Sequence, residues 1–311
     1  MTDIQKTVKR VGAGGQRDAF AGYHPSINLL YFITAIGFAM FFTHPVCLAL
    51  SLICAFSYAT RINGGKTLRF TLVYMIPMLI VTALLNPMFN HEGATILAYL
   101  PNGNPLTLES TLYGAAASFM LITVILWFIC FNEVMTSDKF IYLFGRVIPA
   151  LSLVLSMALR FVPRFGAQIK VISNAQKCIG RDATNGSVLQ KAKHGIKILS
   201  ILITWALENA IETADSMKGR GYGLPGRTAF SIFRFDRRDG WAALYIFICA
   251  AAVITGAATD IYRFRYFPTI KGYWAGIGTV LVFIAYLALG LFPTLVNIKE
   301  DIVWKRIESK I

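Results

Sequence analysis

Acidic side chains occur in two patterns that could support chemistry. Asp236 and Asp239 stand three residues apart, a spacing suited to a magnesium–diphosphate site in an intramembrane prenyl-transfer enzyme. Such an enzyme needs a second acidic cluster, and the sequence offers no convincing one. Glu208, Glu212 and Asp215 share one face of a helix, where a solvated face or pairing with nearby Lys and Arg is favoured over cation binding.

Two arginines stand beside glycines at the ends of apolar periodic segments, in Gly180-Arg181-Asp182 and Gly219-Arg220-Gly221. A guanidinium presents its donors as a rigid fork, which suits carboxylate and carbonyl groups in the groove of a partner. Glycine at such a place can end a helix in the left-handed conformation. Taken alone, the pattern is typical of an ordinary helix that ends at glycine and carries a solvated arginine.

The chain lacks the motifs of several enzyme classes. No Gly-rich phosphate loop with Lys-Ser/Thr occurs, so ATP is not hydrolysed by this chain. No G-x-S-x-G nucleophile motif is present. The five cysteines and four histidines are scattered without metal-ligand spacing. We therefore expect no catalytic residue, metal or cofactor in this chain.

The candidate tips follow two long amphipathic helices. The first is expected from Arg160, bent at its entry by Pro163. The second is expected from Ser187, which forms a capping box with Gln190, to Gly219. At 1.5 Å per residue the second would be about 50 Å long. Its apolar stripe is expected to pack on the first helix and on a membrane partner, and comprises Leu189, Ala192, Ile196, Leu199, Ile203, Ala206, Ala210, Ala214 and Met217.

Composition places these helices in a membrane protein. The 311 residues are 56% hydrophobic and 15% charged, with a mean hydropathy of +0.57, and average soluble domains carry about a quarter charged residues. The net charge is +14, and sixteen of the thirty Lys and Arg lie between Phe131 and Gly240. By the positive-inside rule this basic stretch is cytoplasmic. No nucleic-acid recognition motif accompanies the charge.

Apolar runs predict about six membrane spans, with both termini in the cytoplasm. A cytoplasmic loop is expected at Arg61, Lys66 and Arg69, a kink at Pro77, and an external loop from Pro87 to Glu109. Arg263, Arg265 and Lys271 oppose the positive-inside rule in the last hairpin. The expected spans are Ile27–Phe42, Val46–Tyr58, Phe70–Leu85, Thr111–Phe131, Trp241–Ala257 and Tyr273–Phe292.

The fold class expected is all-α, in three parts. Residues 1–131 form an N-terminal membrane part, 132–239 a cytoplasmic domain of long amphipathic helices, and 240–311 a C-terminal membrane hairpin and tail. The run Phe140–Leu159 could be a span or two short helices beneath the membrane. The second interpretation is favoured, because charged residues flank the run on both sides.

The chain resembles the transmembrane T component of energy-coupling factor transporters, which are importers of the ABC class. The resemblance covers most of the chain, beginning with His24-Pro25 before the first span. Its strongest signals are Leu159-Arg160-Phe161-Val162-Pro163, Ala175-Gln176, and the segment from Ala214 to Tyr222. In that family each of two coupling helices ends in a short motif with a central arginine, which seats in a groove of a cytoplasmic ATPase.

The resemblance implies a non-catalytic subunit of a vitamin or micronutrient importer in a bacterial or archaeal cell membrane. Its partners would be two ABC ATPase subunits or one fused ATPase, which bind ATP and magnesium, and a substrate-binding membrane S component. Ala210, Ala214 and Met217 would serve packing of the coupling helices. A conventional ABC permease is the alternative within transport.

Gly219-Arg220-Gly221 fits the family motif, with glycine where alanine is frequent. The first tip departs from it, because the family has Ala-Gln, two residues and then arginine, whereas here Ala175-Gln176-Lys177-Cys178 is followed by Ile179. Two interpretations stay open. Either Gly180-Arg181-Asp182 is a shifted motif, or this tip docks by its shape and through Lys177.

Overall fold

The computed structural model describes residues 18–99, 105–145, 148–181, 187–225, 233–262, 264–272 and 276–308. Contacts divide the chain into two units. The first combines Met1–Thr136 with Phe233–Ile311, and the second is Ser137–Ile232. The N-terminal and C-terminal apolar segments therefore form one body, into which the second unit is inserted in the sequence.

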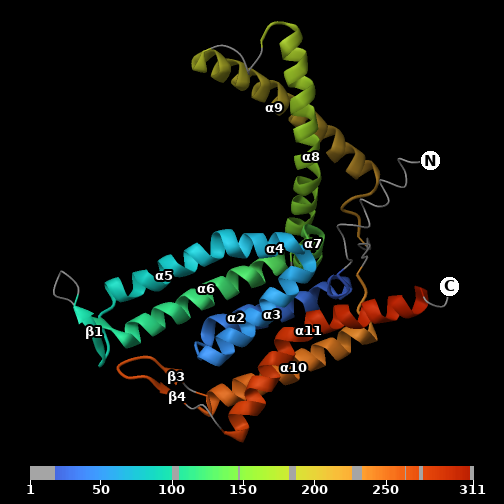
Figure 1. Cartoon of the computed structure of the whole chain (residues 1–311). Helices are drawn as coiled ribbons and strands as arrows, with labels where there is room; N and C mark the ends of the chain where they lie inside the picture. Colours follow the sequence, from blue (N-terminus) through green and yellow to red (C-terminus); the bar gives the residue numbers. More distant parts are fainter. Residues whose placement is uncertain are drawn as a thin grey trace. The chain divides into compact units, whose positions relative to one another are not determined.

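The first unit is a bundle of helices (Figure 1). Four of its helices, α3, α6, α10 and α11, are long and apolar enough to cross a membrane, and Pro25–Phe41 and Val73–Phe89 are shorter apolar segments. Together they correspond to the six expected spans. The helices are η1 (Phe20–Gly22), α2 (Pro25–Phe41), α3 (Pro45–Asn63), α4 (Gly65–Phe70), η2 (Thr71–Met75), α5 (Ile76–Phe89), α6 (Leu108–Val134), α10 (Arg237–Ala258) and α11 (Ile277–Glu308).

The same dipeptide, His-Pro, begins the first two long helices. The His24 Nδ1 atom accepts from the Ser26 N–H at 3.3 Å, and the His44 Nδ1 atom accepts from the Val46 N–H at 3.2 Å. Each histidine thus caps free backbone donors, while the following proline has the backbone angle that a first helical turn needs. The sequence therefore sets both helix starts locally.

Aromatic side chains fill the centre of the bundle. The Tyr31 hydroxyl donates to the Gly290 carbonyl at 3.1 Å, and the Trp127 indole N–H donates to the Ser51 hydroxyl at 3.1 Å. Both aromatic residues are buried. Because each polar atom has a partner, these large side chains are buried without an unpaired donor. The contacts join α2 to α11 and α6 to α3.

The segment after α3 differs from the expected loop. Arg61 lies in the last turn of α3, and Gly64 turns the chain with φ +58°. The helix then resumes at once, so Arg69 lies in α4 and not in a loop. The five π-helical residues of η2 precede Pro77. A proline removes one helical N–H donor, and the π turn is the local adjustment beside the kink expected there.

Two short antiparallel hairpins connect helices of the bundle. One pairs β1 (Ile96–Tyr99) with β2 (Pro105–Thr107), and the other pairs β3 (Phe264–Arg265) with β4 (Lys271–Gly272). Helix α5 ends only at Phe89 and α6 begins at Leu108. The expected loop from Pro87 to Glu109 is therefore shorter, and part of it is a hairpin.

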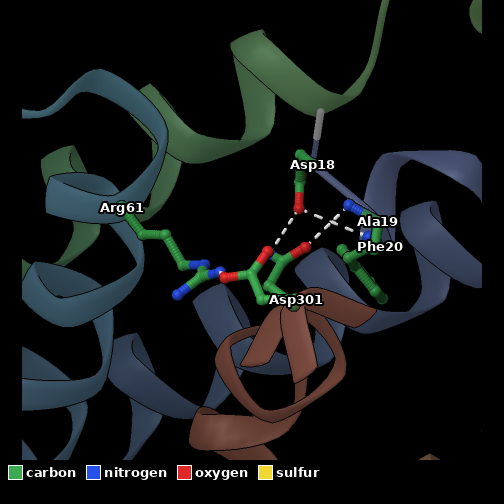
Figure 2. Close-up of polar contacts among 6 residues, drawn as sticks. Asp18, Ala19, Phe20, Arg61 and Asp301 are labelled. Carbon is green, nitrogen blue, oxygen red and sulfur yellow. Dashed lines mark hydrogen bonds and ion pairs between the residues drawn. The ribbon is translucent and has the colours of Figure 1, made fainter. Parts of the chain in front are cut away.

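Figure 2 shows polar contacts that join the start of the described chain to α3 and α11. The Asp18 carboxylate accepts from the Phe20 N–H at 3.3 Å and from the Asn297 side-chain amide. Arg61 of α3 forms an ion pair with Asp301 of α11. Segments from both ends of the sequence are therefore held together at one end of the bundle.

The second unit contains α7 (Ser137–Gly145), α8 (Pro149–Cys178) and α9 (Val188–Gly219). Two short helices were expected in 140–159, but the structure has one short helix, α7, and one long helix, α8. Helix α7 ends at Gly145, but α8 starts at Pro149 and continues for 30 residues. Pro163 lies within this helix and not at its entry. Proline is favoured in the first turn of a helix. The entry to the helix is therefore at Pro149 and not at Pro163, where the sequence analysis expected it.

Candidate functional site

Helices α8 and α9 cross in Figure 1 and are held together by a small apolar centre. Ile172 of α8 and Ile198 and Leu202 of α9 are buried there. Phe165 meets Trp205 edge to face, with ring centroids 6.0 Å apart. The contact holds the two helices together.

A polar contact flanks this crossing. The Arg164 guanidinium lies over the Trp205 ring at 5.2 Å and donates to the Asn209 side-chain oxygen at 2.9 Å. A cation–π contact of this kind adds about 0.5–1 kcal/mol at an exposed site. Arg164 is thereby oriented along α9, toward the end that carries Arg220.

The face of α9 that contacts α8 is not the expected apolar stripe. Ile198, Leu202 and Trp205 make the contact, whereas Ile196, Leu199 and Ile203 of the stripe are 69%, 53% and 51% exposed. One residue turns a helix by about 100°, so the contact uses a neighbouring face. The helix is apolar on both faces, and periodicity alone could not choose between them.

The residues expected to pack the coupling helices lie toward the end of this stripe. Ala210 and Ala214 are exposed, and Met217 is half-buried beside a hollow between α8 and α9. The two alanines therefore lie outside the contact with α8. Their packing role remains a prediction for the surface of another subunit.

Helix α9 ends in a Schellman motif. The Gly221 N–H donates to the Lys218 carbonyl at 2.9 Å, and the Tyr222 N–H donates to the Met217 carbonyl at 3.0 Å. Gly221 has φ +75°, the left-handed conformation that was expected and that only glycine adopts without strain. Arg220 is the last residue before this turn, and its side chain is exposed and lines a hollow between α8 and α9.

Helix α8 ends in the same way. The Gly180 N–H donates to the Lys177 carbonyl at 3.0 Å, the Arg181 N–H donates to the Gln176 carbonyl at 2.9 Å, and Gly180 has φ +76°. The residue before the left-handed glycine is Ile179. The two helix ends therefore have matching backbones, and Ile179 takes the position that Arg220 has in α9.

This register answers part of the question that the sequence left open. Arg181 follows the glycine and corresponds to Tyr222, not to Arg220. Whether Arg181 contacts a partner from this different position stays a prediction. Asp182 lies outside the described residues. Aligning the two segments on Gly180 and Gly221 was the signal in the sequence that could have found this register.

A hollow of about 530 Å³ lies between α8 and α9 beside the second tip. Three arginines line it, Arg160, Arg164 and Arg220, with one carboxylate from Glu212. Positive charge therefore exceeds negative charge around the hollow, which favours an acidic group on a partner. The sequence analysis selected Arg220 but missed its two neighbours, which are separated from it by about sixty residues.

The acidic pair of the alternative enzyme has a structural role. Asp239 is buried, and its carboxylate accepts from the His24 N–H at 3.1 Å and from the Asp236 N–H at 3.0 Å. The pair belongs to the capping box that starts α10. Among the described residues no group of three or more His, Cys, Asp or Glu side chains is arranged to hold a metal ion. Glu208 and Asp215 are exposed on α9.

The apolar bundle and the crossed helix pair define a polytopic, helical membrane protein with an arginine-tipped amphipathic insert. The chain belongs to the CbiQ family, described as cobalt transport protein, which matches residues 23–231. Sequence resemblance to T components of energy-coupling factor transporters is thereby confirmed.

Several relatives carry the name energy-coupling factor transporter transmembrane protein EcfT. The protein from Lacticaseibacillus paracasei is 42% identical over 94 residues, which are 30% of this chain and 35% of the relative. The protein from Lactobacillus helveticus is 32% identical over 113 residues, 36% of this chain and 41% of the relative. A longer match, to the protein from Bacillus selenitireducens, is 26% identical over 252 residues and covers 74% of this chain and 90% of the relative.

Proposed function

We propose that this chain is the transmembrane coupling subunit of an energy-coupling factor importer. One observation carries the proposal: a chain of this family holds Arg220 at the exposed end of a rigid 32-residue helix. The names of the relatives agree with this role. The subunit would perform no covalent chemistry and would transmit movement.

The partners follow from the surfaces that the helix pair exposes. Arg220 and its cationic surroundings would seat in an acidic groove of an ABC ATPase, either one of two subunits or half of a fused protein. ATP and magnesium would be bound by those ATPases. The exposed apolar stripe of α9, with Ile196, Leu199 and Ile203, would contact a separate substrate-binding membrane subunit for a vitamin or another micronutrient.

Transmission would occur by rigid-body movement. Closure of the ATPases around ATP would displace the helix tips, and the crossing at Trp205 would carry the displacement along both helices. Different contacts in the two states of the ATPases supply the free energy for such a shift. The bundle would remain in a bacterial or archaeal cell membrane, with the helix pair and both termini in the cytoplasm.

The alternatives are less well supported. A conventional ABC permease would form its own translocation path and would need no separate substrate-binding subunit. A prenyl-transfer enzyme would need Asp236 and Asp239 as ligands of magnesium, but Asp239 is engaged by two backbone N–H groups. The family and the named relatives favour the coupling subunit over both.

The test is purification of the tagged full-length chain from native membranes in a mild detergent, with identification of bound proteins. The expected partners are one or two proteins with a Gly-rich ATP-binding loop and a small multi-span membrane protein. The chain alone should convert no prenyl diphosphate in the presence of magnesium. Recovery without any ATPase would overturn the proposal, and magnesium-dependent prenyl transfer would favour the enzyme.

A further inference from the structure

The two ends of the helix pair share a backbone fold and differ in the side chain at its last helical position. In both Schellman motifs the left-handed glycine has nearly the same φ, +76° at Gly180 and +75° at Gly221. The residue before the glycine is Ile179 in α8 and Arg220 in α9. Side chains at equivalent positions of equivalent backbones leave the helix in the same local direction.

Ile179 is an exposed apolar side chain at the end of α8. Its side chain is 60% exposed, and the following helix begins with Val188 and Leu189, which are 86% and 82% exposed. Apolar side chains exposed at the end of α8 and at the start of α9 would gain free energy if a partner removed them from water. If a partner groove lined by carboxylates covered Ile179, those carboxylates would lose water without gaining a positively charged partner from this side chain.

The surroundings of Arg220 are cationic. Arg160 and Arg164 line the same hollow, and Glu212 supplies one opposing carboxylate. A partner groove that receives this end must supply negative charge, because desolvating several guanidinium groups without a counter-charge is costly. The two helix ends therefore require grooves of different chemistry.

Arg181 does not restore the missing charge at the first end. It follows Gly180, and its N–H is held by the Gln176 carbonyl at 2.9 Å. The corresponding residue in α9 is Tyr222, which follows the left-handed Gly221. The Arg181 side chain therefore leaves the backbone after the left-handed glycine, whereas the Arg220 side chain leaves it before the glycine.

We propose that Ile179 is the docking side chain of the first tip and enters an apolar groove on an ABC ATPase, while Arg220 enters an acidic groove on another. The two ATPase surfaces are then different, and they belong to two non-identical subunits or to the two halves of a fused one. This inference rests on the proposed coupling function and adds the chemistry of each partner surface to it.

Photo-crosslinking in the assembled complex can test whether the grooves differ. A benzophenone amino acid is introduced at Cys178 or at Gly219, which are equivalent positions one residue before each tip. Cys178 is exposed, and a Cβ at Gly219 meets no atom within 4 Å. We expect crosslinks to two different ATPase segments, apolar for position 178 and rich in Asp or Glu for position 219. Crosslinks of both positions to one and the same segment of identical subunits would overturn the inference.

Substitutions at the first tip give a second, independent readout. Ile179→Ser should weaken ATPase retention about tenfold or more, because a buried isoleucine contributes roughly that factor, and Ile179→Val should retain most of it. Ile179→Arg should also weaken retention, and Arg181→Ala should leave it near wild type. The backbone at Ile179 is unstrained, with φ −99° and ψ 18°, so these variants should fold.

The outcomes separate this inference from the coupling function. If wild type retains no ATPase, the coupling function fails, and the inference fails with it. If Arg220→Ala releases the ATPases but Ile179→Ser does not, or if Ile179→Arg strengthens retention, the coupling function stands and only the inference is wrong. Release by Arg181→Ala to the extent seen with Arg220→Ala would instead establish the shifted motif.

Discussion

Ile179 and Arg220 occupy the same position in two helix ends whose hydrogen bonds and left-handed glycines match. The pair shows that the two tips have a common shape and separate chemistry. Backbone hydrogen bonds set the shape of each tip, so the residue before the glycine can vary without changing that shape. The groove on the partner then determines which side chain binds there.

The left-handed glycines should be required for the shape of both tips. Gly221→Ala places a Cβ at φ +75° and 3.0 Å from a Leu224 methyl group, whereas Gly180→Ala meets no atom within 4 Å. The left-handed conformation costs about 1–2 kcal/mol for an L residue. We expect faster hydrogen exchange at the Tyr222 and Arg181 amides respectively, and the larger effect at Gly221. Unchanged exchange in both variants would contradict the cap geometry.

Asp239 should stabilise the junction between α10 and the segment before α2. Asp239→Asn keeps the shape but removes the charge and one acceptor oxygen, and the carboxylate accepts from both His24 and Asp236. We expect a loss of about 1–3 kcal/mol in the free energy of unfolding, measured as a lower melting temperature in detergent. Glu208→Gln, at an exposed carboxylate of α9, is the control and should melt like wild type.

The ion pair between Arg61 and Asp301 should contribute only modestly. The two side chains are 22% and 43% exposed, and solvent-screened pairs contribute up to about 1 kcal/mol. A double-mutant cycle with Arg61→Ala and Asp301→Ala isolates their interaction from the effect of Arg61 on the end of α3. The coupling energy should fall as salt is added. A coupling energy of several kcal/mol that does not depend on salt would contradict this interpretation of Figure 2.

Trp205 should hold the crossing of α8 and α9. Trp205→Ala removes the contacts with Phe165 and Arg164 and is expected to cost about 3 kcal/mol, the low end for a tryptophan truncation, because the ring is half-buried. Faster proteolysis within the helix pair would report the loss. Leu207→Ala is the matched control on the same helix, because Leu207 is 62% exposed. Leu207→Ala should leave proteolysis unchanged.

Features that depend on neighbouring residues in the sequence could be predicted. The capping box of Ser187 and Gln190 and the left-handed Gly221 are present as expected, because short-range hydrogen bonds determine them. The apolar runs likewise gave the membrane helices, because a bilayer demands length and hydropathy. The two backbone N–H groups that donate to Asp239 lie far apart in the sequence or at a helix start, and only the structure brings them to one carboxylate.

Features that depend on distant residues could not be predicted. Which face of α9 meets α8 is decided by Phe165 and Ile172 of the other helix, and the periodic pattern of α9 alone allowed two faces. The hollow that joins Arg160 to Arg220 requires the crossing geometry for the same reason. The helix entry predicted at Pro163 was wrong, because the helix already begins at Pro149, fourteen residues earlier. A proline within a long amphipathic helix is tolerated when packing compensates for one lost hydrogen bond.

Retention of ATPase by Arg220 variants tests the central claim most directly. Tagged wild type, Arg220→Lys, Arg220→Ala and Arg181→Ala are purified side by side from the same native membranes, and bound ATPase is quantified per chain. A charge-assisted contact contributes about 1.5–3 kcal/mol, so Arg220→Ala should retain at least about tenfold less. Arg220→Lys should lie between, because it keeps the charge and loses the fork, and Arg181→Ala should match wild type. Equal retention by wild type and Arg220→Ala would contradict the account, because the α9 tip would then not be a docking site.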